Sequence, residues 1–288
     1  MEKITLNTGI EMPMEGFGVF QISDLAVCEK AVLEAIQTGY RLIDTASVYM
    51  NEGAVGRAIK ESGIAREDLF LTSKAYVQEM GYENTKKAFE QSLQNLGVEY
   101  LDLYLIHQPF GDYYGSWRAM EELYKEGRIR AIGVSNFMSD RIIDLCHNVD
   151  VIPAVNQIEL HPFYQRGEEL EILREYGIAA QAWAPFAEGM NSMFTNPVLA
   201  EIGKPYNKSA AQVVLRWNIE RKVSVIPKSV HKERMEQNLD IWDFELSKED
   251  LEKIAKLDLG KPQMLDTRKP SEVKRVYDFL KNPVITTL

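Results

Sequence analysis

The sequence is poor in the residues that build disulfide frameworks and metal centres. It has two cysteines, Cys28 and Cys146, and four histidines among 288 residues. The two cysteines do not have the spacing of metal ligands, and cytosolic enzymes seldom use a disulfide. We therefore interpret both cysteines as packing residues and expect no bound metal.

Long apolar runs and an excess of positive charge are also missing. No run approaches the ~20 apolar residues that a membrane span needs, and the amino terminus lacks the basic and then apolar order of a signal peptide. Lys and Arg number 33 against 43 Asp and Glu, a formal net charge of −10. A protein that tracks phosphates needs a basic stripe. We expect an unexported, cytoplasmic protein that binds neither nucleic acid nor a membrane.

The apolar residues that are present, 45% of the sequence, can bury a large core. Short apolar runs alternate with amphipathic helical patterns along the chain. This alternation predicts parallel strands and a single (β/α)8 barrel rather than two domains. We therefore expect one domain over residues 1–288.

The same patterns predict individual elements. Residues 4–6 and 10–12 flank Asn7-Thr8-Gly9 and predict a β-hairpin ahead of the barrel. Predicted barrel strands lie near residues 40–44, 69–74, 101–107, 129–134, 154–159, 178–183 and 223–227, with a short eighth near 239–241. Predicted helices include residues 52–62, 84–96, 116–126 and 209–220. Beyond residue 260 the periodicity weakens into a tail with three prolines, for which the pattern predicts no conformation.

Four polar residues lie at or just after the ends of three predicted strands: Asp44, Tyr49, Lys74 and His107. The carboxyl ends of parallel strands meet at one edge, where chemistry gathers in barrels. Each residue alone also fits a structural role, as a helix N-cap, a loop aromatic, a solvated strand end or a turn histidine. Their coincidence at one edge favours an active site.

These four side chains have complementary chemistry for donating a proton. A tyrosine with a pKa of about 10 is a poor acid at neutral pH unless a cation stabilises the tyrosinate. Lys74 is the candidate cation, and Asp44 supplies the counter-charge. A neutral His107 can hydrogen-bond a carbonyl oxygen while Tyr49 delivers the proton. None of the four can supply a hydride, so we expect a nicotinamide cofactor.

The nicotinamide needs a binding site other than the glycine fingerprint of the dinucleotide fold. Gly16-Phe17-Gly18 has no third glycine at the required spacing. Lys228 and Arg234, with Ser229 between them, span a predicted junction of strand and helix, where two cations and free N–H groups suit a phosphate. A solvated basic patch is the alternative. Trp183, at the end of the sixth predicted strand, offers a flat face to a nicotinamide ring.

Three stretches resemble the signatures of the aldo-keto reductases, in the order in which that family has them. They are residues 39–46 (GYRLIDTA) with Tyr49, Asn51-Glu52 and Val55-Gly56, residues 127–137 (GRIRAIGVSNF), and residues 226–230 (IPKSV) with Arg234, Gln237 and Asn238. The resemblance extends from about Ile4 to Leu246. It is strongest to the smaller microbial members that reduce aldehydes and dicarbonyls.

The resemblance implies roles for individual residues and NADPH/NADP⁺ as the cofactor. The family's catalytic Asp, Tyr, Lys and His fall on Asp44, Tyr49, Lys74 and His107. Its contacts to the cofactor fall on Ser135, Asn136 and Gln157 for the carboxamide, on Lys228 and Arg234 with Ser229 and Val230 for the 2′-phosphate, and on Gln237 and Asn238 for the adenine. The predicted hairpin would cover the floor of the barrel.

Two departures from the family's habit bear on the substrate. Where many members have His-Trp-Pro, this chain has His107-Gln108-Pro109, and Lys74 is followed by Ala75-Tyr76. The pocket loses an apolar wall at Gln108, whose amide can donate and accept hydrogen bonds. We predict Phe20, Tyr76, Gln108, Tyr113 and Tyr114 at the pocket or its rim, and Trp117 as an aromatic that only packs.

The sequence thus predicts an NADPH-dependent enzyme that reduces small aldehydes, ketones or dicarbonyls to alcohols. We expect a monomer, with an oligomer left open. One alternative is an NADP(H)-binding redox sensor or accessory subunit with little turnover, against which the intact set of four residues argues. Another is a phosphate-binding barrel isomerase that uses His107 and Lys74, which leaves the 135–136 and 228–238 motifs without a role.

Overall fold

An eight-stranded parallel sheet forms the centre of the protein. The computed structural model describes residues 1–279 and residue 281. The strands follow one another in chain order from β3 to β10: β3 (Phe17–Gly18), β4 (Leu42–Asp44), β5 (Phe70–Ala75), β6 (Leu103–Ile106), β7 (Ile132–Ser135), β8 (Val155–Glu159), β9 (Ala179–Trp183) and β10 (Val223–Val225). Every residue of β4 to β8 is buried, as expected for a parallel sheet that is covered on both faces.

Hydrogen bonds between the first and last strands close this sheet into a barrel. The Gly16 N–H donates to the Val225 carbonyl at 2.8 Å, and the Val225 N–H donates to the Met14 carbonyl at 2.9 Å. The predicted (β/α)8 barrel is therefore confirmed.

The position predicted for one strand was wrong. Residues 239–241 do not form a barrel strand, because α9 (Lys232–Leu239) ends there. The remaining strand is β3, which precedes the first one predicted. With only two residues in the ladder, β3 is too short to show the apolar run by which the other strands were recognised.

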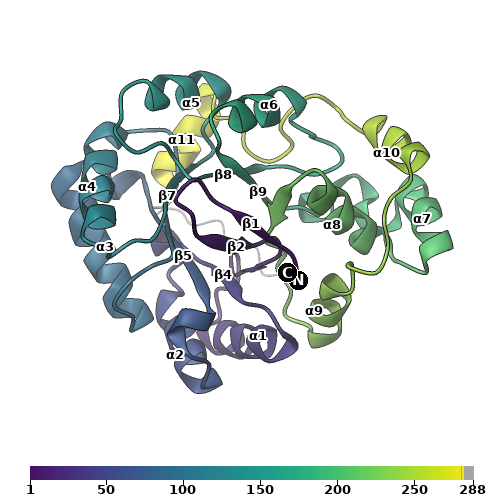
Figure 1. The fold of residues 1–288 in the computed structure, drawn as a ribbon, viewed down its shortest axis with the longest axis horizontal. Helices are drawn as coiled ribbons and strands as arrows, with labels where there is room; N and C mark the ends of the chain where they lie inside the picture. Colours follow the sequence, from purple (N-terminus) through teal and green to yellow (C-terminus); the bar gives the residue numbers. More distant parts are fainter. Residues whose placement is uncertain (280, 282–288) are drawn as a thin grey trace.

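The predicted hairpin is confirmed and closes one end of the barrel. It pairs β1 (Lys3–Thr5) with β2 (Glu11–Pro13) in antiparallel register. Its buried Met12 clusters with Leu42, Phe70 and Leu103, which are the first residues of β4, β5 and β6. The hairpin lies across the middle of the ring of strands and helices (Figure 1). It covers the amino-terminal ends of the strands, and the carboxyl ends remain for a site.

Helices surround the barrel. They are α1 (Leu25–Thr38), α2 (Glu52–Ser62), α3 (Tyr82–Leu96), α4 (Tyr113–Lys125), α5 (Ser139–Cys146), α6 (Gly167–Glu175), α7 (Pro197–Gly203), α8 (Ala210–Glu220), α9, α10 (Lys248–Ala255) and α11 (Pro270–Asp278), with short 3₁₀ segments η1 (Ser47–Tyr49), η2 (Arg66–Asp68), η3 (Val77–Glu79), η4 (Ala187–Thr195) and η5 (Lys204–Tyr206). The four predicted helices are confirmed as α2, α3, α4 and α8. Local chemistry fixes some of their starts: the Ser209 side chain and that of Gln212 form a capping box ahead of α8.

The tail after residue 260 contains α11, which the sequence pattern did not predict. Its apolar side chains Val273, Val276 and Tyr277 have helical spacing, but they are few, and only Val276 is buried. Residues 282–288 of that tail, and with them the end of the expected domain, lie outside the described residues.

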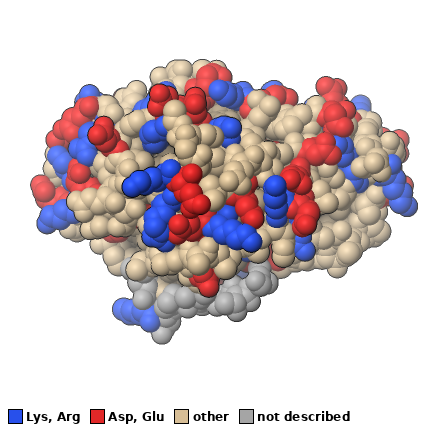
Figure 2. Space-filling view, turned by 90° about the horizontal axis from the view of Figure 1, so that it is seen from below, with Lys and Arg blue, Asp and Glu red and all other residues tan. Residues whose placement is uncertain are grey.

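None of the helices in the described chain is long and apolar enough to span a membrane. Figure 2 shows acidic and basic side chains interspersed over one face of the molecule. Opposite charges at such spacing compensate one another, so this face has no strong field of one sign.

The contact between α2 and α3 generates a stability prediction. A Cβ on Gly56 would lie 2.4 Å from the Leu96 carbonyl oxygen, whereas a Cβ on Gly53 of the same helix would meet only Arg57 Nη1, at 3.6 Å. Gly56→Ala should lower the free energy of unfolding by about 1–3 kcal/mol through overpacking. Gly53→Ala is the matched control and should leave it unchanged or raise it by up to ~1 kcal/mol, because alanine is the better helix former. Urea titrations measure both, and equal effects of the two substitutions would contradict this packing.

Candidate active site

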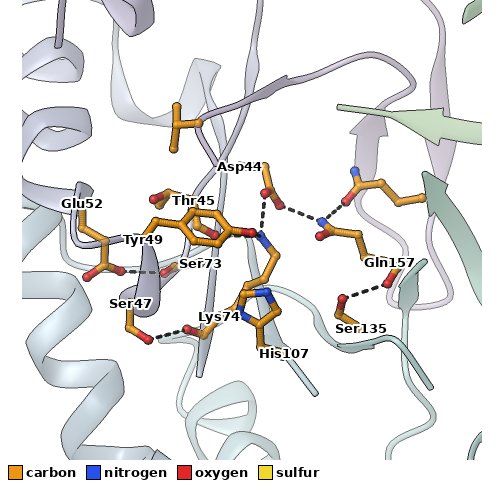
Figure 3. Close-up of polar contacts among 12 residues, drawn as sticks. Asp44, Thr45, Ser47, Tyr49, Glu52, Ser73, Lys74, His107, Ser135 and Gln157 are labelled. Carbon is orange, nitrogen blue, oxygen red and sulfur yellow. Dashed lines mark hydrogen bonds and ion pairs between the residues drawn. The ribbon is translucent and has the colours of Figure 1, made fainter. Parts of the chain in front are cut away.

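The four predicted catalytic residues meet at the carboxyl end of the barrel (Figure 3). Asp44 ends β4, Lys74 is the penultimate residue of β5, Tyr49 ends η1, and His107 directly follows β6. Lys74 Nζ lies 2.5 Å from Asp44 Oδ1 and 3.5 Å from the Tyr49 hydroxyl. The centroids of the Tyr49 and His107 rings are 5.6 Å apart. The structure thus brings all four into one cluster.

Lys74 and Asp44 form an ion pair that is shielded from water, with Lys74 0% exposed. Lys74 Nζ also donates to the Thr45 carbonyl at 2.8 Å, and Asp44 Oδ2 accepts from Gln157 Nε2 at 2.7 Å. Burial lowers the pKa of Lys74 and raises that of Asp44, while the attraction between the two opposes both shifts. The additional hydrogen bonds are what such a pair needs to offset its desolvation.

The pKa of Tyr49 shifts in the direction opposite to the one expected from Lys74. Burial raises the pKa of Tyr49 well above its usual value, and the charge of Asp44 adds to this. In the resting site, loss of hydration therefore outweighs the nearby ammonium. The phenol stays protonated at neutral pH, as a proton donor must, and Lys74 can stabilise the tyrosinate as it forms.

His107 is neutral at pH 7, as the sequence argument requires. It is 8% exposed, and burial, with the charge of Lys74 as a second cause, lowers its pKa well below the usual value. Its backbone is held on two sides, since its N–H donates to the Ala75 carbonyl at 2.9 Å and its carbonyl accepts from Asn136 Nδ2 at 3.0 Å. A neutral imidazole carries one N–H with which to bind a carbonyl oxygen.

A cavity of about 730 Å³ opens beside this cluster. Asp44, Tyr49 and His107 lie in its wall, and Lys74 reaches it only through Tyr49 and Asp44. The wall also contains most of the predicted binding residues: Ser135, Asn136, Gln157, Trp183, Lys228, Ser229, Val230, Arg234, Phe20, Tyr76 and Gln108.

The cavity wall contains a hydrogen-bond network suited to holding a planar ring. Trp183 Nε1 donates to Asn136 Oδ1 at 2.9 Å, and Asn136 Nδ2 donates to Ser135 Oγ at 3.1 Å. Ser135 Oγ in turn donates to the Gln157 carbonyl at 2.8 Å. These bonds fix the indole in the wall, where its apolar surface can stack on a nicotinamide.

The cavity wall also contains two cations, Lys228 and Arg234, with Ser229 and Val230. Within the described part of the chain, neither cation has a carboxylate oxygen within 4.0 Å. Burial lowers the pKa of Lys228, against the opposing charge of Glu188. Cations without a local partner fit a phosphate, so the residues present suit a phosphorylated nicotinamide cofactor.

Four of the predicted site residues, Gln237, Asn238, Tyr113 and Tyr114, lie outside the described wall of the cavity. Gln237 is exposed on α9 and Asn238 is buried beside Tyr40, and neither belongs to the described wall of the cavity. Their contact with adenine stays a prediction.

Tyr113 and Tyr114 also lie outside the described wall. The Tyr113 ring packs on Phe137, and the Tyr114 hydroxyl bonds Asp144. The reason is that α4 begins at Tyr113 and not at residue 116, so both rings are on the helix and not on the mouth loop. Trp117 only packs, as predicted: it is fully buried and donates to the Val151 carbonyl at 3.1 Å.

Two segments of the wall were not predicted. They are residues of the loop after β9, namely Phe186, Glu188, Gly189, Met190 and Phe194, and residues of the tail, namely Gln263, Met264, Leu265, Arg275, Val276 and Phe279. The general rule that the mouth loops of a barrel determine specificity is the only sequence signal that points to them.

Taken with the fold, this geometry defines a barrel oxidoreductase that acts on carbonyl groups. A sequence profile of the aldo/keto reductase family matches residues 21–259, and the chain belongs to this family. It is 48% identical over 257 residues to glyoxal reductase of Bacillus subtilis, covering 89% of this chain and 92% of that protein. It is 42% identical to morphine 6-dehydrogenase of Pseudomonas putida, covering 89% and 91%.

Solved structures agree with this assignment. An aldo-keto reductase from a Medee basin deep-sea metagenome library matches with a TM-score of 0.90 and 40% identity, over 92% of this chain and 98% of that one. A Bombyx mori aldo-keto reductase, solved in complex with NADP, matches with a TM-score of 0.87 and 33% identity, over 92% and 95%.

The lowered pKa of His107 predicts how stability depends on pH. Below about pH 6.5 the unfolded chain binds a proton at this histidine and the folded protein does not, so stability falls as the pH falls. The wild type should lose up to about 1.4 kcal/mol per pH unit relative to His107→Gln between pH 6.5 and 5. Urea titrations of both proteins at several pH values measure this difference, and parallel pH curves would show that folding does not lower the pKa of His107.

Proposed function

We propose that this protein reduces small dicarbonyls and related polar aldehydes to alcohols with NADPH. The observation that carries the substrate class is the buried amide of Gln108, next to His107 in the wall of the cavity. Similarity to a glyoxal reductase supports the same class. Membership of the aldo/keto reductase family supports the reaction.

Different residues of the chain bind the cofactor and act on the substrate. Lys228 and Arg234 would hold the cofactor's phosphate, and Asn136 with Trp183 would hold its ring. NADPH, when bound, supplies the hydride. Each of the four clustered residues then has one task on the substrate side.

His107 presents its single N–H to the carbonyl oxygen of the substrate and so orients it beside Tyr49. The Tyr49 hydroxyl gives its proton to that oxygen as negative charge develops there. Lys74, 3.5 Å away, stabilises the phenolate that remains, and Asp44 keeps the ammonium in place. The burial that raises the pKa of Tyr49 keeps the proton available until substrate arrives.

Gln108 connects this machinery to the choice of substrate. It is 6% exposed, and its Oε1 has no hydrogen-bond partner among the described residues. A buried acceptor without a donor is costly, and a hydroxyl or hydrated carbonyl of a substrate can supply the donor. An apolar aldehyde cannot, and so we expect it to be the poorer substrate.

The Gln108 argument predicts a reversal of substrate preference. Wild type should consume NADPH with higher kcat/KM for methylglyoxal than for an apolar aldehyde of similar size, because only the polar substrate can bond the amide. Gln108→Trp should move that ratio toward the apolar aldehyde by about tenfold or more. Loss of NADPH absorbance measures both.

The control for this change is Gln94→Trp, at an exposed position on α3. An unchanged substrate ranking in Gln108→Trp would remove the polar-pocket argument and leave the reductase assignment intact. Absence of NADPH oxidation by wild type with any aldehyde would contradict the proposed reaction.

The cation pair predicts a preference for NADPH over NADH. A charge-assisted hydrogen bond contributes about 1.5–3 kcal/mol, so Arg234→Ala should weaken NADPH binding about tenfold or more and NADH binding far less. Lys232→Ala, on the same helix and outside the described cavity wall, is the matched control. Fluorescence titrations give both dissociation constants, and equal binding of the two cofactors by wild type would refute the phosphate site.

A further inference from the structure

We propose that Glu159 is a positioning residue whose carboxylate holds residues 263–265 in place as one wall of the substrate cavity. This inference rests on the proposed carbonyl reduction. Glu159 itself is absent from the described wall and so acts through the segment that it holds.

Glu159 is placed for this role by strand geometry. It is the last residue of β8 and is 2% exposed. Residues i and i+2 of a strand lie on the same face, so Glu159 follows Gln157 toward the mouth of the barrel. Gln157 bonds Asp44, whereas Glu159 makes its bonds to the tail. One strand thus serves both the catalytic cluster and the tail.

Three consecutive backbone amides donate to this one carboxylate. The N–H of Gln263 donates to Oε1 at 2.6 Å, and the N–H of Leu265 donates to Oε2 at 3.2 Å. The N–H of Met264 lies between them, 3.3 Å from Oε1 and 3.4 Å from Oε2. Successive N–H groups that converge in this way form an anion-binding concavity, and bonds to a charged acceptor are stronger than neutral ones.

A histidine completes the surroundings of the carboxylate. His161 is fully buried, and its Nε2 lies 3.2 Å from Glu159 Oε1. Because the carboxylate is the acceptor, Nε2 is the protonated nitrogen of that ring. His161 therefore holds the carboxylate from the barrel side, in addition to the contacts of the tail.

The held segment is part of the cavity wall, and Glu159 is the acceptor for its three backbone N–H groups. Gln263, Met264 and Leu265 all line the cavity, and they belong to no helix or strand. Away from Glu159, Arg275 Nη2 of α11 donates to the Met264 carbonyl at 3.0 Å, and Asn191 Nδ2 lies 3.5 Å from Gln263 Oε1. Leu265 also packs on the apolar cluster that includes Val48 and Tyr76. Glu159 therefore supplies the backbone hydrogen bonds that join this wall to the barrel.

The consequence is a separation of substrate binding from cofactor binding. The cation pair that would bind the phosphate lies after β10 and on α9, and no hydrogen bond or ion pair of the described residues joins it to residues 263–265. Loosening residues 263–265 should thus weaken binding of the carbonyl substrate and leave NADPH affinity intact.

The test is Glu159→Gln, which keeps the size of the side chain and removes the charge. Its amide NH₂ would face N–H donors, so hydrogen exchange at the amides of residues 263–265 should become about tenfold faster or more. KM for methylglyoxal should rise about five- to tenfold, kcat should change less than about threefold, and the NADPH dissociation constant should be unchanged. Glu175→Gln, which removes the same charge from an exposed site on α6, should change none of these values.

Unchanged exchange at residues 263–265 in Glu159→Gln would show that Glu159 does not hold this segment. Faster exchange with an unchanged KM would show that the held segment does not contribute to substrate binding. Glu159→Asp keeps the charge on a shorter side chain and should exchange at an intermediate rate; it decides the question if the glutamine variant does not fold. Hydrogen exchange requires no turnover. A wild type without reductase activity would therefore count against the proposed function and leave the exchange result readable.

Discussion

The site depends on the buried ion pair between Lys74 and Asp44. Two charges without water are stable only when each has a partner, and removing one partner of such a pair costs about 3–5 kcal/mol. Here the partners come from three strands, because Asp44 also accepts from Gln157 on β8. The pair therefore fixes the spacing of β4, β5 and β8 at their carboxyl ends, and it places a cation beside Tyr49.

The barrel makes this arrangement possible. The hairpin covers the amino-terminal ends of the strands, so the carboxyl ends provide the opening where polar side chains can meet a substrate (Figure 1). Burial raises the pKa of Tyr49 and lowers that of His107, so Tyr49 stays protonated and His107 neutral. The proposed reaction needs these two states to donate a proton and to orient a carbonyl. In the proposed reaction, desolvation keeps the proton on Tyr49, and Lys74 would stabilise the phenolate that the transfer leaves.

The sequence could predict those features that have a recognisable local pattern of apolar residues. Asp44, Lys74 and His107 end apolar runs long enough to be recognised as strands, so the cluster could be located before its geometry was known. The two residues of β3 are too few to show periodicity, and α11 is a short helix with few apolar residues, of which only Val276 is buried. The direction of the Tyr49 pKa shift depends on the balance between desolvation and a cation, which residue spacing does not contain.

The central claim is that Tyr49, held between Lys74 and the cavity, is the proton donor. The most direct measurement is the turnover of Tyr49→Phe with NADPH and methylglyoxal, because this change removes only the hydroxyl. The account predicts that kcat falls by about 10²-fold or more while the NADPH dissociation constant is unchanged. Near-normal turnover in this variant would contradict it.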